Sequence, residues 1–169
     1  MNAKHSTTID ESVSPTKSQM RHLFIELNRE DSQLRGRLLD AAIAGLRLAR
    51  DPDSADVRRD AARVWAAIEP ILSHHLEAED KHLLPWLDQH THLSPEILRK
   101  VRQCHQKLRT LIGTVARNDL TRVTADQARE TAQALTGLAV TLDDAIEDEQ
   151  RRLLPTLHRA LFSATRGTS

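Results

Sequence analysis

The sequence predicts an all-α protein that folds as an up-down-up-down antiparallel four-helix bundle, and three observations predict it. The apolar residues are mostly Leu, Ala, Ile and Val, with two Trp, two Phe, no Tyr and little Gly or Pro. This balance favours helices over strands. Apolar residues recur every three or four positions along four long segments, which is the period of a bundle seam. The connections between these segments are short, so consecutive helices are expected to be antiparallel neighbours.

The boundaries of the four helices follow from local breaking and capping signals. The helices are expected at about residues 17–50, 55–89, 95–117 and 125–162. The stretch from Asp51 to Ser54 is a breaker cluster that ends the first helix. Ser94 before Pro95 is a helix N-cap followed by proline at the first helical position. Thr124-Ala-Asp-Gln matches a capping box that opens the fourth helix.

Three prolines interrupt this helical pattern. Pro70 and Pro85 lie inside the second predicted helix, and Pro155 lies inside the fourth. Because proline has no backbone N–H and clashes with the preceding turn, kinks or breaks are expected at these positions.

The length of the chain and its charge limit the class of protein. The 169 residues suit one domain, with a disordered N-terminal arm at 1–16, the bundle at 17–163 and a C-terminal tail at 164–169. The 24 basic and 24 acidic side chains balance, and no basic stripe supports nucleic-acid binding. Neither a signal peptide nor a long apolar run is evident, so we expect no membrane span. The single cysteine fits a reducing compartment, and a cytoplasmic location is expected.

Each of the four apolar seams is interrupted by a polar residue. The interruptions are Asp31 in the first helix, His75 and Glu79 in the second, His105 in the third and Glu149 in the fourth. Counted from the helix ends at one pole of the bundle, they fall within about 6 Å of one level. The sequence therefore predicts one polar cluster inside the core.

A buried cluster of carboxylates and imidazoles has a natural partner in a metal cation. Unpaired buried charges are costly, and this donor set suits Fe, Mn or Zn. His75 and Glu79 are four residues apart and share a helix face. The alternatives are a hydrogen-bonded polar pair for these two, and pairing of Asp31 with Arg35 or a histidine. His74 and His82, beside the motif, are expected to be partly exposed.

The chain also contains an internal repeat. The segment from His75 to Pro85 aligns with the segment from Ala145 to Pro155 at an offset of 70 residues, which pairs Glu79 with Glu149. A second and looser alignment places Asp31 opposite His105. Two copies of one helical hairpin would arrange donor residues symmetrically about a central site.

These residues resemble the hemerythrin-like family of HHE cation-binding domains. Its pattern is a His on the first helix, His-x-x-x-Glu on the second, a His on the third and His-x-x-x-Glu on the fourth. The most specific part of the resemblance is the segment His-His-Leu-Glu-Ala-Glu-Asp-Lys-His-Leu-Leu-Pro-Trp-Leu. The resemblance places metal ligands at His75, Glu79, His105 and Glu149. Asp31 and Ala145 stand where the two remaining histidines are expected.

The resemblance implies a non-haem di-iron centre bridged by two carboxylates, in proteins that bind or sense oxygen, nitric oxide, peroxide or iron. Asp31 can still ligate through oxygen, whereas Ala145 cannot ligate at all. A mononuclear site, an asymmetric pair completed by water and a lost site are therefore the alternatives to a standard di-iron centre. Asp144 and Asp148 are expected to face away from the seam.

The leading hypothesis is a metal-binding protein that binds or senses oxygen, oxidants or iron; whether it is an enzyme is left open, with a non-enzymatic role favoured. Its metal would be one or two non-haem iron ions, with Mn or Zn as alternatives, held by Asp31, His75, Glu79, His105 and Glu149. A peroxide-consuming enzyme is a second hypothesis, although no dedicated acid–base group is evident. A third is a metal-free bundle that serves as a protein-interaction or regulatory module. A haem bundle is a weaker fourth, because no haem-attachment motif is present.

Overall fold

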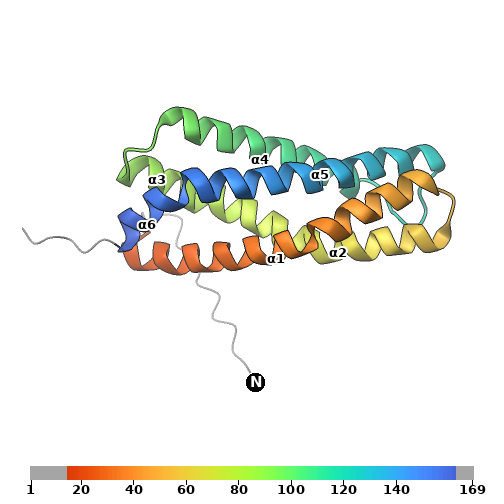
Figure 1. The fold of residues 1–169 in the computed structure, drawn as a ribbon, viewed down its shortest axis with the longest axis horizontal. Coiled ribbons are helices and arrows are strands. Elements are labelled where there is room, and N and C mark those ends of the chain that lie inside the picture. The colour runs from red at the N-terminus through yellow and green to blue at the C-terminus, as the bar shows by residue number, and fades with distance from the viewer. Residues whose placement is uncertain (1–14, 163–169) are drawn as a thin grey trace, which may run out of the picture.

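The structure, a computed structural model that describes residues 15–162, is a bundle of four helical rods (Figure 1). In chain order the elements are α1 (Lys17–Arg50), α2 (Ala55–Ala78), the π-helix η1 (Glu79–Leu83), α3 (Leu84–His90), α4 (Pro95–Ala116), α5 (Ala125–Arg152) and α6 (Leu154–Phe162). The run α2–η1–α3 forms the second rod and α5–α6 the fourth. The rods alternate in direction, and α6 ends beside the start of α1 (Figure 1). This confirms the predicted all-α bundle. The predicted arm, apart from Pro15 and Thr16, and the predicted tail lie outside the described residues.

Side-chain caps begin the long helices. The hydroxyls of Ser94 and Thr124 accept hydrogen bonds from the backbone N–H groups of Glu96 and Gln127, as expected at these N-caps. Gln127 completes the capping box by accepting from the backbone of Thr124. A further capping box at Thr16 and Gln19 opens α1. These caps satisfy N–H groups that the first turn of a helix leaves without partners.

The prolines affect the helices unequally. The helix α2 continues through Pro70, so the break expected there does not occur. A proline removes one backbone hydrogen bond, and the remaining bonds and packing of a long rod maintain the helix. Pro85 lies in the first turn of α3, directly after the π-helix. Pro155 lies in the first turn of α6, after a one-residue interruption at Leu153.

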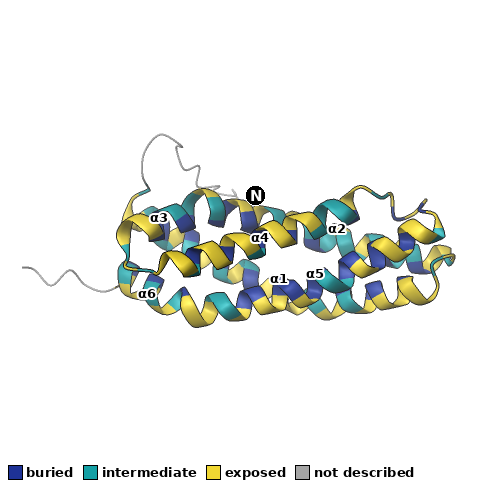
Figure 2. Ribbon diagram, turned by 90° about the horizontal axis from the view of Figure 1, so that it is seen from above, coloured by how far each residue is buried: buried dark blue, intermediate teal, exposed yellow. Residues whose placement is uncertain are grey.

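The core follows the predicted seams along the whole bundle. The seam residues are buried or partly buried, and buried positions face the interior while the outer faces are exposed (Figure 2). They form three apolar clusters from one pole to the other. Along the helices, the polar cluster lies between the first apolar cluster, at the α3 and α6 end of the bundle, and the second apolar cluster.

The helices α1 and α5 approach each other closely at Gly45. A Cβ atom at this position would lie 2.5 Å from Oγ1 of Thr136 and 2.9 Å from the carbonyl oxygen of Ala132. Glycine is therefore required for the close approach of the two helix backbones. None of the helices in the described part of the chain has the length and apolarity needed to cross a membrane.

Candidate metal centre

The structure brings all five sequence-predicted site residues together in the core. Each rod contributes: Asp31 from α1, His75 and Glu79 from the second rod, His105 from α4 and Glu149 from α5. Asp31, His75, Glu79 and His105 are buried, and the side chain of Glu149 is 12% exposed. The predicted common depth of these residues is therefore realised in the fold.

The imidazole of His75 lies against two carboxylates. Its Nε2 is 3.3 Å from Oδ1 of Asp31 and 3.5 Å from Oε2 of Glu79. The spacing of four residues along the helix brings Glu79 onto the face that carries His75. The seam of α1 supplies Asp31 from the opposing rod.

The imidazole of His105 lies against two carboxylates in the same way. Its Nε2 is 3.2 Å from Oε2 of Glu79 and 3.5 Å from Oε1 of Glu149. Glu79 thus lies between the two imidazoles, close to both Nε2 atoms.

The donor atoms fall into two groups that share Glu149. In each group the donor atoms lie within 4.8 Å of one another. The first group is Asp31, His75 and Glu149, and the second is Glu79, His105 and Glu149. Each group offers one imidazole nitrogen and two carboxylates, a donor set that suits first-row transition metals.

The π-helix η1 starts within the site. Glu79 and Asp80 are its first two residues, and they contact opposite nitrogens of one ring. While Glu79 approaches Nε2 of His105, Nδ1 of His105 donates a hydrogen bond to Oδ1 of Asp80 over 2.8 Å. Single π-turns inside α-helices are frequent at functional sites. This one lies in the second rod, which supplies more of the site residues than any other rod.

Asp80 is itself held in place by Arg109. Nη1 of Arg109 lies 2.5 Å from Oδ2 of Asp80, and Nη2 donates to the carbonyl of Leu76 over 3.1 Å. Sequence reasoning missed Asp80 because it lies off the apolar seam. Its position next to Glu79 in the motif was the one signal that could have identified it.

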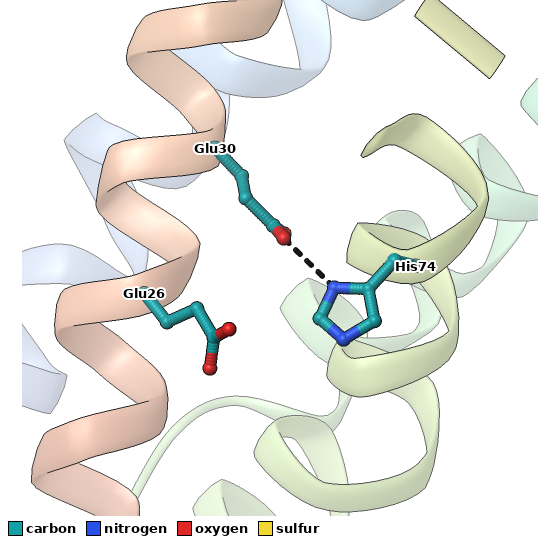
Figure 3. A group of neighbouring side chains, drawn as sticks. All are labelled: Glu26, Glu30 and His74. Carbon is teal, nitrogen blue, oxygen red and sulfur yellow. Dashed lines mark hydrogen bonds and ion pairs between the residues drawn. The ribbon is translucent and has the colours of Figure 1, made fainter. Parts of the chain in front are cut away.

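Glu30 has the corresponding role at His75. Nδ1 of His75 donates to Oε2 of Glu30 over 3.3 Å, and Nδ1 of His74 donates to Oε1 over 2.8 Å. Figure 3 shows the second of these contacts between α1 and α2, with Glu26 one turn from Glu30. Glu26, Glu30 and His74 form a further group of potential ligands at the surface. The sequence analysis assigned no role at the site to Glu30 or His74. It did expect His74 to be partly exposed, and the side chain is about half exposed.

Several buried polar atoms at this site have no hydrogen-bond partner. They are Oδ1 of Asp31, Oε2 of Glu79 and Nε2 of His105. The close approaches among them are not aligned as hydrogen bonds. An unsatisfied buried polar group costs on the order of 1–3 kcal/mol, so three in one place call for a common partner. A cation would satisfy all three, and the residues present therefore fit a metal ion.

The electrostatics of the cluster point the same way. Burial raises the pKa of Asp31 to about 6, although the charge of His75 opposes the shift. Burial and the charge of Glu79 raise the pKa of Glu149 to about 7, although the neighbouring His105 opposes the shift. Negative charge is therefore disfavoured here unless positive charge accompanies it.

The two imidazoles respond to the same surroundings. Burial disfavours the charged form of His75, but the hydrogen bond to Glu30 and the charge of Glu79 outweigh it and raise its pKa to about 9. Burial likewise opposes charging of His105, while the neighbouring carboxylates of Glu149 and Glu79 outweigh it and raise its pKa to about 10. Without a metal, these protons supply the positive charge that the carboxylates require.

The remaining candidates on α5 lie outside the cluster. Ala145 is buried beside Glu149 and offers no donor atom. Asp144 is exposed and Asp148 pairs with Arg152 over 2.6 Å, so neither belongs to a donor group around His75 or His105. Both face away from the seam, as the register of the helix predicted.

A four-helix bundle with carboxylate and imidazole donors in its core defines a class of cation-binding proteins. The family model of the hemerythrin HHE cation binding domain matches residues 19–157, and the protein belongs to this family. Family membership implies a bound metal cation. Neither a curated protein nor a solved structure matches the chain significantly.

Proposed function

We propose that this protein holds non-haem iron at Asp31, His75, Glu79, His105 and Glu149, and that it binds or senses oxygen, oxidants or iron. The observation that carries the proposal is the convergence of three unpartnered buried atoms from Asp31, Glu79 and His105. Mixed imidazole and carboxylate donors suit iron, and also Mn or Zn.

Two ions per chain are proposed, one for each donor group. Support comes from the two groups of three donors that share Glu149. Asp31 supplies an oxygen donor on the His75 side, in place of a histidine. On the His105 side, Ala145 leaves Glu79, His105 and Glu149 as the donors that the chain provides.

The residues of the site serve to bind the metal and to orient its histidine ligands, and not to transfer protons. Glu30 and Asp80 accept hydrogen bonds from the Nδ1 atoms of His75 and His105, which leaves both Nε2 atoms to face the core. The apolar clusters on either side shield the site from water along the length of the bundle. A bound iron would supply a redox-active centre able to take up oxygen or peroxide. Since the titratable groups at the site are occupied as donors or as their partners, binding or sensing is favoured over turnover.

A metal-free interaction module is the second candidate function. The observation in its favour is an exposed apolar stripe on α1, where Leu39, Ile43 and Leu46 follow one another at helical spacing. The absence of a donor at Ala145 is also consistent with a site that has been lost.

Elemental analysis tests the proposal. The protein is purified from iron-supplemented cells, and metals per chain are measured beside a His75→Ala/Glu79→Ala variant. A Glu77→Ala/His92→Ala variant is the matched control, because it removes the same residue types from exposed positions. About two irons per chain, retained in the control and lost in the core variant, are expected. No metal in a well-folded wild-type protein would sink the proposal and favour the interaction module.

A further inference from the structure

A solvent-open cavity of about 330 Å³ lies between α4 and α5, directly beside the candidate metal centre. Cys104 of α4 and Ala145 and Glu149 of α5 are among its lining residues. Glu149 also belongs to both donor groups of the centre. The cavity therefore reaches a proposed metal ligand from the side. One water molecule needs only about 15 Å³, so a molecule of several heavy atoms fits.

The internal repeat explains why the cavity lies at this position. At an offset of 70 residues, Ala145 is the counterpart of His75, and Glu149 is the counterpart of Glu79. In the His75 half, the imidazole fills its place and lies 3.5 Å from Glu79. In the other half the side chain ends at Cβ, and open volume adjoins it. Part of the cavity thus adjoins the position at which the first half of the repeat has an imidazole.

The charges that line the cavity select against anions. Four acidic residues, Asp144, Glu147, Asp148 and Glu149, outnumber the two basic residues, Lys100 and Arg151. Both basic side chains are already paired, Lys100 with Glu96 and Arg151 with Glu147. Of the acidic residues, Glu147 and Asp148 are paired as well, with Arg151 and Arg152, so Asp144 and Glu149 leave a net negative charge that disfavours a small anion. A neutral nitrogen base, unlike a protonated one, keeps the lone pair that a donor needs.

We propose that this cavity binds a small neutral nitrogen base of imidazole size, which presents a donor atom to the group formed by Glu79, His105 and Glu149. The donor role rests on the proposed metal function, whereas binding in the cavity does not. The ligand would supply in trans the ring nitrogen that position 145 lacks.

Cys104 provides a readout that is independent of the metal. It is the single cysteine of the chain and is partly buried in the cavity wall. Its rate of alkylation by iodoacetamide is measured at fixed pH as imidazole is titrated, in the metal-free protein and in the Co(II)-loaded protein. A saturable, several-fold slowing is expected in both. In the metal-free protein, sodium azide at the same concentrations is expected to give no protection.

Two variants control this measurement. Ala145→Leu occupies the part of the cavity next to Glu149, where the base would bind, so the alkylation rate of this variant is expected not to depend on imidazole. Ala66→Leu makes the same change at an exposed position of α2 and should retain the wild-type response. The proposal would be overturned if the alkylation rate of Cys104 in the wild-type protein did not depend on imidazole. It would also be overturned if azide protected Cys104 of the metal-free protein as well as imidazole does.

The visible spectrum of the Co(II)-loaded protein tests the donor role. Imidazole is expected to shift its ligand-field bands at the concentrations that protect Cys104, and Ala145→Leu should abolish the shift. Protection without a spectral shift in a metal-loaded protein would overturn the donor role. A chain that takes up no metal would refute the proposed function and with it the donor role, while protection of Cys104 in the metal-free protein would still decide whether the cavity binds imidazole.

Discussion

Oδ1 of Asp80 lies 2.8 Å from Nδ1 of His105, and this contact determines which ring nitrogen of His105 faces the core. A carboxylate can only accept, so Nδ1 carries a proton, and when the ring is neutral Nε2 presents its lone pair towards Glu79 and Glu149. Asp80 thus acts on the candidate centre through His105, without being among the proposed ligands.

Replacing Asp80 by Asn is expected to weaken metal binding by about 10–100-fold, the usual cost of losing the hydrogen-bond partner of a metal-binding histidine. The neutral amide introduced by this substitution would orient the ring less strongly and would not raise the basicity of Nε2. Competition titration with a chelating indicator would measure the change. Asp148→Asn, which removes a surface ion pair with Arg152, is the control and should bind as the wild type does. Equal affinities for the two variants would contradict a positioning role for Asp80.

Replacing Ala145 by His is expected to tighten metal binding about tenfold or more, a gain of roughly 1.4 kcal/mol. The new imidazole would stand four residues before Glu149, as His75 stands before Glu79, and the adjoining cavity offers it room. Isothermal titration with the metal would measure the affinity. Ala145→Leu fills a similar volume without a donor and should show no gain. A loss of affinity in Ala145→His would show that the second half of the repeat no longer accepts a ligand.

Replacing Gly45 by Ala is expected to destabilise the fold by about 1–3 kcal/mol, the usual cost of overpacking. The added methyl group would meet the side chain of Thr136 and the backbone of Ala132, which would force α1 away from α5. Gly36→Ala on the same helix is the matched control, because a Cβ there has no neighbour within 4 Å. It should stabilise the helix by about 0.5–1 kcal/mol through helix propensity. Urea unfolding monitored by circular dichroism would measure both, and a similar effect at the two positions would refute the packing argument.

The metal-free protein is expected to lose stability as the pH rises from about 6.5 towards 9, the range between the unfolded and folded pKa values of the histidines. The pKa of His75, about 9, and that of His105, about 10, lie above the usual value for histidine. The native state therefore binds more protons than the unfolded state in this range, and its advantage disappears as the pH rises through the folded pKa values. The raised pKa values of Asp31 and Glu149 extend the same trend to lower pH.

Bound metal should reverse this dependence, because the cation displaces the protons and its affinity rises as they dissociate. Urea unfolding at several pH values, with a chelator and with metal, would measure the two trends. A metal-free protein whose stability increases with pH over this range would contradict the assigned protonation of the cluster.

Much of the helical framework could be predicted from the sequence because its signals are local. The caps at Ser94 and Thr124 and the apolar period of the four seams each depend on neighbours within a few residues. The common depth of the polar interruptions followed from the helix rise and short connections alone. The repeat aligns Ala145 with His75, so the sequence alone indicates that position 145 lacks an imidazole.

Some features of the protein were decided only by the tertiary structure, because they depend on contacts between residues of different rods. The sequence by itself determined the fold class, the helix order and the five residues that gather in the core, because periodicity encodes which face of a helix is buried. It carried no signal for Glu30, and for Asp80 only its position next to Glu79, since both residues lie off the seam and act through a histidine ring of another segment. The uninterrupted course of α2 through Pro70, the requirement for Gly45 and the cavity beside Ala145 likewise arise from packing between helices, which no local pattern records.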